Sequence, residues 1–372
     1  MNTWLLTGAT GTLGRELLWD LLAAGDAVRC IVRAGDAAEA EKRIDELIAR
    51  RPQGPIPAEQ RERVRAVRGD LTQPLLGLSQ PEYDALAREV TGVIHGAANV
   101  NFTQALHEAR KINVEGTRQV LAFAERAMDL GGLRRFEHIS TAYVAGDRRG
   151  RVLETEGYVG QKFHNTYERT KSEAERLIEE HRDRLPIVLL RPSIVVGDSR
   201  TGYTSSFKVM YWPLKILAGG WVWVIPADPE GGVDLVPVDY VVDVMRGLRA
   251  RPDSIGKTVH IAAGEMATTI GAAARLASGF FDVRTPRMMP PKIFDYTLRP
   301  VLYASVGLAR TEQLRRGRVY IPYLAHGARF DTSVRDGLVG MAAPSVDGYF
   351  ERLLRFCIES DWGKKDPSAP RG

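Results

Sequence analysis

Cysteine is scarce in this chain. Only Cys30 and Cys357 occur among 372 residues, which is too few for a disulfide framework or a cysteine-based metal site. Both are expected to be buried thiols in a reducing compartment. The first residues, MNTWLLTGATG, also lack the charged n-region, apolar core and cleavage site of a signal peptide, so we expect a cytoplasmic location.

Long apolar runs and an excess of one charge are lacking as well. The most apolar window, residues 207–226, is interrupted by two lysines, a proline and a glycine pair, whereas a membrane span needs about 18 or more nearly uninterrupted apolar residues. We expect no transmembrane segment there, but a pocket wall or core with at most weak membrane contact. The 51 basic residues are scattered among 46 acidic ones and give a net charge of +5, which does not favour nucleic-acid binding.

Within the first two hundred residues, short apolar runs rich in β-branched residues alternate with longer helical patterns. This alternation predicts an α/β fold with a doubly wound, Rossmann-type parallel sheet that helices cover on both faces. Such sheets bind ligands at the carboxyl ends of their strands, where the strand order reverses. The predicted strands are residues 4–9, 27–34, 64–70, 92–98, 136–145 and 187–195, and the predicted helices are residues 13–24, 37–50, 112–128 and 165–181.

The pattern changes beyond residue 200, where glycine and proline punctuate aromatic runs. We expect residues 1–200 to form a dinucleotide-binding domain to which residues 232–265 return. Residues 201–362 are expected to form most of a smaller, interleaved substrate lobe. The polar, proline-containing tail, residues 363–372, is predicted to be disordered.

Glycines mark the first strand–helix junction. LLTGATGTLGRELL places Gly8, Gly11 and Gly14 directly after the first strand and at the start of the first helix. Gly8 permits a tight turn, Gly11 lets a pyrophosphate approach the backbone, and Gly14 lets strand and helix pack closely. At this junction of a long α/β chain, the pattern predicts a dinucleotide site.

Two later strand ends suggest how the rest of a dinucleotide would bind. Arg33 stands 19 residues after Gly14 at the end of the second strand, where an arginine suits a 2′-phosphate, so we predict NADPH. NADH is the less favoured alternative, with Asp36 on its ribose. Asp70 is placed to accept a hydrogen bond from the adenine amino group, with Leu71 against the ring, although Asp is also a common turn former.

Tyr167 and Lys171, in YERTK, lie one helical turn apart. YVGQK (158–162) and YWPLK (211–215) show the same spacing, but they contain a glycine and a proline that disfavour a regular helix. A phenol has a pKa near 10 and exchanges protons slowly at neutral pH, and a neighbouring cation would lower that pKa. We therefore predict Tyr167 as the proton donor and Lys171 as the cation that tunes it.

The strand before this helix offers a hydroxyl for the same reaction. Thr141 lies 26 residues before Tyr167 and could hydrogen-bond a carbonyl oxygen as negative charge develops on it. Ser140 is the alternative, since neighbouring strand residues point to opposite sides. His95 has no His or Cys at metal spacing and is predicted to be structural, with no metal site. The helix residues expected to face solvent are Glu168, Arg169, Glu173 and Glu175.

Several motifs in family order resemble the extended short-chain dehydrogenase/reductase superfamily. They are TGATGTLG, GDLT, HGAANVNF, INVEGT, HISTAYVAG, YERTK and LLRPSIVVGD, and they span residues 5–198. HGAANVNF together with Arg33, the helix expected over residues 37–50, and VDLVPVDYVVDVM resemble the branch of thioester reductases and fatty acyl-CoA reductases. That resemblance implies an NADPH-dependent enzyme that reduces an acyl thioester to an aldehyde or alcohol.

The resemblance also implies roles for individual residues. The catalytic residues would be Tyr167, Lys171, Thr141 and Asn113, where Asn113 either holds the active-site helix or caps its own helix. The cofactor would contact Gly8, Thr10, Gly11, Thr12, Leu13, Gly14, Arg33, Asp70, Leu71, Gly96, Ala97, Ala98, Asn113, Lys171, Pro192, Ser193 and Ile194. The substrate would contact Asn101, Thr141, Tyr143 and Tyr203, with its acyl chain held by residues 203–223.

The expected partner is a hydrophobic acyl thioester on CoA or on a separate carrier protein, and a homodimer is one possible assembly. The alternatives are a steroid-type or flavonoid-type alcohol dehydrogenase, a nucleotide-sugar epimerase or dehydratase, and a catalytically silent NADP-binding regulator. A nucleotide sugar would want a polar, basic pocket rather than the aromatic window at 207–226.

Overall fold

The computed structural model describes residues 1–52, 54–305, 311–312, 314–315, 317–325 and 327–365. Its larger part is a seven-stranded sheet in the order β12-β7-β5-β4-β1-β2-β3, and all its neighbouring strands pair in parallel. The strands are β1 (Thr3–Thr7), β2 (Ala27–Val32), β3 (Val64–Arg68), β4 (Gly92–His95), β5 (Arg135–Ile139), β7 (Ile187–Pro192) and β12 (Thr258–Ile261). The predicted Rossmann-type fold is confirmed.

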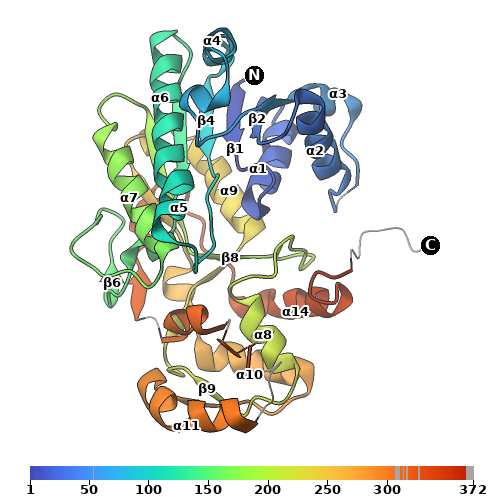
Figure 1. The fold of residues 1–372 in the computed structure, drawn as a ribbon, viewed down its shortest axis with the longest axis vertical. Coiled ribbons are helices and arrows are strands. Elements are labelled where there is room, and N and C mark those ends of the chain that lie inside the picture. The colour runs from blue at the N-terminus through green and yellow to red at the C-terminus, as the bar shows by residue number, and fades with distance from the viewer. Residues whose placement is uncertain (53, 306–310, 313, 316, 326, 366–372) are drawn as a thin grey trace.

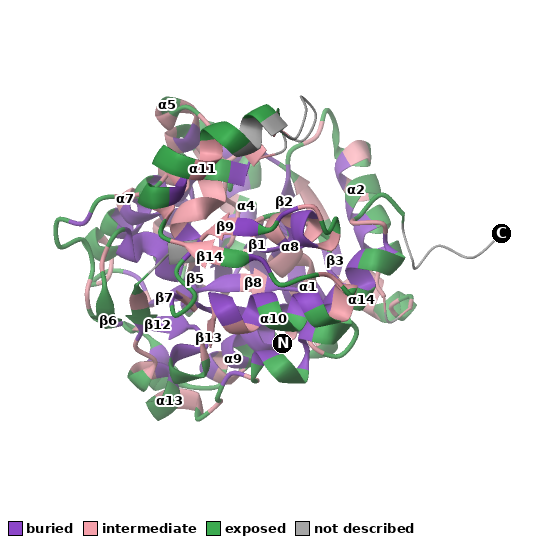
Figure 2. Ribbon diagram, turned by 90° about the horizontal axis from the view of Figure 1, so that it is seen from below, coloured by how far each residue is buried: buried purple, intermediate pink, exposed green. Residues whose placement is uncertain are grey.

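Helices cover both faces of this sheet (Figure 1). One face packs against α1 (Thr12–Ala23), α2 (Ala37–Ala49) and α9 (Val238–Arg249), and the other against α4 (Gln80–Glu89), α6 (Gly116–Asp129) and α7 (Thr166–Glu180). Buried residues follow the strands and the helix sides that face them (Figure 2). The strand order reverses between β1 and β4, so their carboxyl ends form the crevice where such a sheet binds its ligand.

The helix predicted over residues 112–128 is interrupted. The short helix α5 (Leu106–Arg110) leads into a π-helical turn, η2 (Lys111–Glu115), and α6 begins only at Gly116. A π-helical turn shifts the register of the side chains that follow it. It lies beside α7, and the buried Asn113 stands in its middle.

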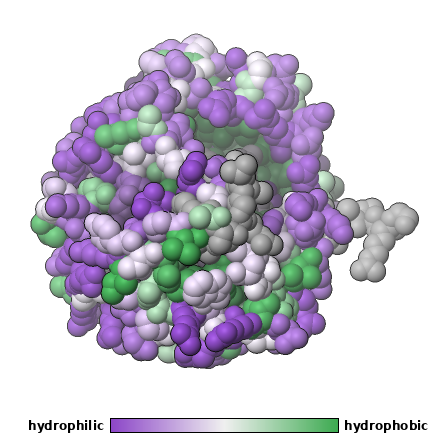
Figure 3. Space-filling view, turned by 60° about the horizontal axis from the view of Figure 1, so that its bottom comes forward, coloured by the Kyte–Doolittle hydropathy of each residue, from purple (hydrophilic) through white to green (hydrophobic). Residues whose placement is uncertain are grey.

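The smaller lobe lies below the carboxyl ends of the strands (Figure 1). Its elements are α8 (Tyr211–Ala218), β9 (Val224–Pro226), β10 (Gly232–Val233), β13 (Thr268–Thr269), α10 (Ile270–Phe281), β14 (Arg287–Met289), α11 (Pro291–Ser305), η6 (Arg318–Ala325) and α14 (Phe350–Glu359). Hydrophobic side chains gather on the face of this lobe shown in Figure 3. In the part of the chain that the structure describes, no helix combines the length and apolarity of a membrane span.

The two lobes interleave more than once. The segment that follows β8 (Ile194–Val196) enters the smaller lobe, and β11 (Leu235–Pro237) returns to pair with β8 before α9 and β12 rejoin the main sheet. A second return, which the sequence analysis did not anticipate, is α13 (Ser333–Val339), which packs on β12 and α9. β15 (Ala328–Phe330) pairs with β6 (Gly150–Val152) just before it.

The C-terminal tail predicted to be disordered lies mostly outside the described residues. Residues 363–365 continue the turn that follows α14, where the Trp362 amide donates to the Cys357 carbonyl oxygen. Both cysteines are buried free thiols.

Gly14 provides a test of the strand–helix junction. A Cβ atom at Gly14 would lie 2.1 Å from the Gly8 carbonyl oxygen, so Gly14→Ala should cost about 1–3 kcal/mol of stability. It should also weaken dinucleotide binding, because relief of the clash must move the turn. Gly279→Ala is the matched control, since Gly279 lies in α10 with no neighbour within 4 Å of its Cβ position, and alanine there should gain about 0.5–1 kcal/mol. Chemical denaturation and cofactor titration would measure both, and equal stability of the two variants would contradict this packing.

Candidate active site

The β1–α1 turn has the geometry of a dinucleotide-binding turn. Gly8 has φ +80°, and a Cβ there would lie 2.7 Å from the Ala97 backbone nitrogen. Gly11 caps α1 without a side-chain hydrogen bond, and the first turn of the helix contains no acidic residue. The amide groups of that turn are therefore left to an anion, which the helix dipole also favours. Thr10, Thr12 and Leu13 complete this turn, and its residues fit the pyrophosphate of a dinucleotide.

At the end of β2, the Arg33 side chain is exposed, while its carbonyl oxygen accepts a hydrogen bond from Arg43. Asp36 caps α2, and its Oδ1 accepts the Glu39 amide at 2.7 Å. That capping bond uses one oxygen of the carboxylate that the NAD alternative would place on a ribose. The Arg33 guanidinium is exposed at the same strand end.

Asp70 follows β3 and serves partly as a turn former. Its Oδ1 accepts from the Thr72 amide at 2.9 Å and from the Thr72 hydroxyl at 2.8 Å. Only Oδ2 then remains to reach an adenine. Leu71, the next residue, packs beside the Gly116 position at the start of α6.

His95, at the end of β4, is part of a directed chain of hydrogen bonds. The Thr117 hydroxyl donates to the Asn113 carbonyl oxygen at 2.7 Å, so it accepts from His95 Nε2 at 3.0 Å. His95 Nδ1 must then accept from the Thr7 hydroxyl at 2.7 Å, and that hydroxyl accepts the Ala97 amide at 3.2 Å. Burial lowers the pKa of His95 to about 3, which keeps the ring neutral as this chain requires.

Asn113 joins the β4 loop to the active-site helix and does not cap its own helix. Its Oδ1 accepts from the Asn99 amide at 2.7 Å, and its Nδ2 donates to the Asn99 carbonyl oxygen at 3.1 Å and to the Thr170 hydroxyl at 2.9 Å. The side chain is buried. Asn113 therefore positions α7 and the loop that contains Gly96, Ala97 and Ala98.

Tyr167 and Thr141 meet at the carboxyl edge of the sheet. The Thr141 side chain is buried and accepts the Tyr143 amide at 3.2 Å. Burial raises the pKa of Tyr167 to about 12, against the lowering effect of the nearby Thr141 hydroxyl. The phenol therefore keeps its proton at neutral pH and is suited to donate it. Of the two candidate hydroxyls, Thr141 is the one that contacts Tyr167.

The Lys171 ammonium is bonded to β5 and not to the Tyr167 hydroxyl, and its predicted effect on Tyr167 stays a prediction. Its Nζ donates to the Ile139 carbonyl oxygen at 2.8 Å and lies 3.2 Å from His138 Nε2. Burial lowers the pKa of Lys171 to about 8, while Glu175 opposes that shift. Because burial also lowers the pKa of His138, the neutral imidazole can accept from the ammonium. An ammonium has three donors, so these two described partners leave one for a ribose hydroxyl.

The charged residues of α7 are not all solvated, which corrects the sequence prediction. Glu168 is buried and accepts from the Tyr323 hydroxyl at 2.6 Å. Glu175 is also buried and forms a two-bonded ion pair with Arg191 of β7, at 3.0 and 2.7 Å. Only Arg169 is exposed as predicted, since Glu173 is largely covered by its pair with Arg110. A carboxylate can be buried here because a partner on another element neutralises or hydrogen-bonds it.

An aromatic wall of Phe102, Tyr143 and Tyr323 reaches Tyr167 through Phe102, and the sequence analysis missed most of it. Phe102 stacks on Tyr167 at 5.8 Å and on Tyr323 at 5.5 Å, while Tyr323 contacts Tyr143 at 4.9 Å. Phe102 ends the HGAANVNF motif, so an aromatic residue just after the fourth strand was an available signal. Tyr323 follows Tyr143 by 180 residues along the chain and had no local signal.

Two predicted substrate residues have hydrogen-bond partners within the protein. Asn101 is exposed, and its Oδ1 accepts from the Thr103 amide and hydroxyl at 3.1 and 2.9 Å. The Tyr203 hydroxyl accepts from Arg15 of α1 at 3.0 Å, and its ring contacts Phe356. Asn101 is therefore occupied by its own turn, and Tyr203 lies over the start of α1. Pro192, Ser193 and Ile194 connect β7 to β8, where the Ser193 amide donates to Ile261 at 3.1 Å.

Known proteins resemble this chain over most of its length. An NAD-binding family model, described as Male sterility protein, matches residues 6–245. The chain belongs to this family. Its assignment to the extended short-chain dehydrogenase/reductase superfamily, with fatty acyl-CoA reductases and terminal reductase domains as relatives, is confirmed.

Three relatives show how much of this chain resembles known members of the family and known structures. Nonribosomal peptide synthetase asaC of Aspergillus flavus is 29% identical over 279 residues, which are 69% of this chain and 26% of that protein. Fatty acyl-CoA reductase 1 of Homo sapiens is 30% identical over 275 residues, 64% of this chain and 53% of that protein. The crystal structure of the terminal R domain from the myxalamid PKS-NRPS biosynthetic pathway has a TM-score of 0.84 at 28% identity, covering 98% of this chain and 92% of that one.

The chain of this family member spans 26% of the length of the first curated relative and 53% of the second. The likeness to the R domain extends over both lobes, since it covers 98% of the chain. Among the described residues, no three His, Cys, Asp or Glu side chains are grouped to hold a metal ion.

The buried Lys171 should make stability depend on pH. Its pKa is lowered from 10.5 to about 8 by folding, so between pH 8 and about 10 the unfolded chain binds more protons and stability rises with pH. Lys171→Met removes this contribution. The difference in unfolding free energy, wild type minus variant, should therefore increase by about 2 kcal/mol between pH 8 and about 10. Denaturant unfolding without cofactor measures it, with the exposed Lys257→Met as a control for charge loss. A difference that does not vary with pH would contradict the lowered pKa of the buried Lys171.

Proposed function

We propose that the protein is an NADPH-dependent reductase of a hydrophobic acyl thioester, carried by CoA or by a separate carrier protein. The observation that carries the proposal is the contact of a protonated Tyr167 with Thr141 beside the aromatic wall. A carbonyl placed against these hydroxyls would have donors for the oxygen and apolar rings for the chain beyond it. The names of the relatives, fatty acyl-CoA reductases and a terminal reductase domain, support the same substrate class.

The chain's residues divide the chemistry between them. NADPH, when bound, supplies the hydride that adds to the thioester carbon. Thr141 and Tyr167 would hold the carbonyl oxygen as charge develops on it, and Tyr167 would give it a proton. The carbon–sulfur bond then breaks, which releases the thiol and an aldehyde, and a second hydride and proton would convert that aldehyde to an alcohol. Lys171 would bind the ribose with its remaining donor and replace the proton lost from Tyr167.

The cofactor preference follows from the second strand end. Arg33 is exposed at the end of β2, while Asp36 Oδ1 already accepts the capping bond of α2. An exposed guanidinium favours a 2′-phosphate. NADPH is therefore proposed over NADH.

Tyr167→Phe tests the catalytic assignment. Loss of the proton donor should lower turnover of a long-chain acyl-CoA by about 10²–10⁴-fold, while NADPH binding should stay unchanged. Tyr158→Phe is the matched control, because Tyr158 has the same spacing to a lysine but is 55% exposed. Turnover is followed by NADPH consumption and by mass analysis of the product. Unchanged turnover in Tyr167→Phe would overturn the assignment.

Arg33→Ala tests the cofactor assignment. Loss of a charge-assisted hydrogen bond worth about 1.5–3 kcal/mol should weaken NADPH binding by about tenfold to a hundredfold and leave NADH binding nearly unchanged. Arg65→Ala on the neighbouring strand β3, exposed and paired with Glu89, controls for the loss of a positive charge. Fluorescence titration with both dinucleotides gives the ratio, and an equal effect on both would rule out 2′-phosphate recognition by Arg33.

A further inference from the structure

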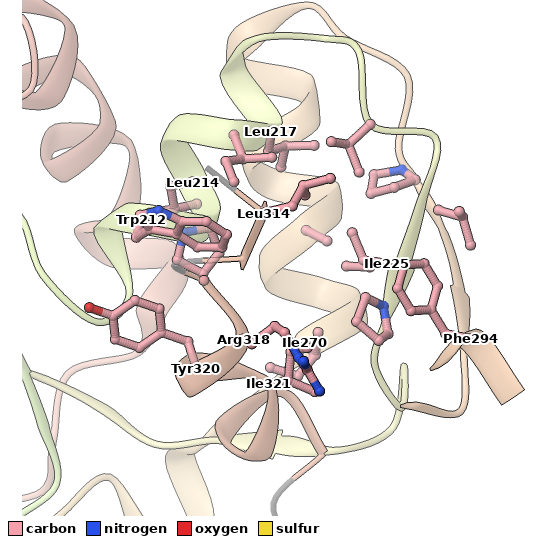
Figure 4. A pocket seen from close by; sticks show the side chains of 18 of the residues that line it. Trp212, Leu214, Leu217, Ile225, Ile270, Phe294, Leu314, Arg318, Tyr320 and Ile321 are labelled. Carbon is pink, nitrogen blue, oxygen red and sulfur yellow. The ribbon is translucent and has the colours of Figure 1, made fainter. Parts of the chain in front are cut away.

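The smaller lobe contains an apolar pocket whose lining includes none of Thr141, Tyr167 and Lys171. Its cavity volume is about 120 Å³, and it lies between α8, β9, α10, α11 and residues 314, 317, 318, 320 and 321. Figure 4 shows the side chains that line it. Of the charged side chains among its described lining residues, Asp295 and Arg299 hydrogen-bond each other at 3.1 Å and Arg318 is exposed. The pocket therefore suits a neutral apolar ligand.

A row of aromatic rings connects this pocket to Tyr167. Tyr320 lines the pocket and contacts Trp212, also a lining residue, at 5.8 Å. Tyr320 contacts Phe102 at 5.8 Å, and Phe102 stacks on Tyr167 at 5.8 Å. Two steps of 5.8 Å each put the Tyr320 ring within about 12 Å of the Tyr167 ring. One extended ligand could therefore reach from the catalytic hydroxyls into the pocket.

The end of the pocket nearest Tyr167 is held in a defined shape. A Cβ atom at Gly317 would lie 1.6 Å from the Trp212 indole, so the indole packs directly on the Gly317 backbone. A side chain at that position would have to displace the ring. Trp212 and Tyr320 therefore form a fixed entrance on this side.

The opposite side of the pocket is closed by Phe294. In Figure 4, Phe294 and Ile225 lie across the pocket from Trp212 and Tyr320. Phe294 is 5% exposed and packs with the buried Val224, against which Met289, Leu298 and Leu314 also lie. Between the two ends, α10 contributes only the small side chains of Ala273 and Ala274 together with Ile270. The cavity is thus apolar, with the Phe294 ring on the side opposite Trp212 and Tyr320.

We propose that this pocket binds the hydrocarbon chain of the acyl substrate and that Phe294 sets the longest chain accepted. The inference rests on the proposed reductase function and adds the location and the limit of chain recognition. The thioester carbonyl lies at Thr141 and Tyr167, the first part of the chain passes Phe102 and Tyr320, and the methyl end meets Phe294.

Two substitutions should change the chain-length profile in opposite directions. Phe294→Ala removes the ring at the far end and should raise kcat/KM for chains longer than the wild-type optimum by at least about tenfold relative to short chains. Ala274→Phe fills the middle of the pocket and should lower kcat/KM for long chains by a similar factor while sparing short ones. Tyr296→Ala is the matched control, since Tyr296 lies on α11 two residues from Phe294 but is 87% exposed. If Phe294→Ala does not fold, the milder Phe294→Leu should shift the profile in the same direction.

The experiment measures reduction of a series of straight-chain acyl-CoA thioesters and, separately, displacement of a fluorescent long-chain fatty acid from each variant. Opposite shifts in both readouts, with Tyr296→Ala unchanged, support the proposal. Normal reduction with an unaltered chain profile in both pocket variants overturns it and leaves the proposed function intact. Probe binding that follows the pocket variants without reduction of any thioester would keep the pocket assignment and reject the proposed reaction.

Discussion

The active site depends on how a highly charged helix, α7, is seated in a mostly apolar interior. A buried charge or amide is tolerated only where a partner replaces its lost water, and α7 meets this requirement on several sides. Glu175 pairs with Arg191 of β7, Thr170 accepts from Asn113 of η2, and Lys171 donates to the Ile139 carbonyl oxygen. Each bond joins α7 to a different element. Their sum fixes the rotation of the helix, and with it the direction of Tyr167.

The same burial sets the protonation state of the site. Burial raises the pKa of Tyr167 to about 12 and lowers that of Lys171 to about 8. The two shifts have one cause, because removal of water disfavours the charged form of each group. In the proposed reaction, Tyr167 would hold its proton for donation, and Lys171, whose pKa is about 8, would replace it. The neutral His95 completes the arrangement by linking β1 and β4 to Asn113 through threonine hydroxyls.

The smaller lobe contributes to this site through rings rather than through charges. Tyr323 of η6 donates to Glu168, the residue after Tyr167, and its ring stacks on Phe102. The lobe is therefore tied to α7 at a buried carboxylate, and the aromatic contacts continue to Tyr320 and Trp212. Because α13 also packs on β12 and α9, the chain crosses between lobes again after η6. Such crossings hold the aromatic wall against the catalytic helix.

By itself the sequence was sufficient for the α/β fold, the glycine turn, and the regular helix on which Tyr167 and Lys171 lie, because period, turn residues and motif order are local properties of the chain. It could not show that Glu168 and Glu175 are buried. Nor could it show that Lys171 donates to Ile139 and lies beside His138, or that Asn101 accepts hydrogen bonds within its own turn. The sequence of a charged helix predicts that its side chains face solvent. Here the partners that allow burial of these carboxylates lie on other elements, β7 and η6. The pairing of Phe102 with Tyr320 and Tyr323, more than two hundred residues later, was decided only by the tertiary structure, since contacts between distant segments leave no periodicity in either one.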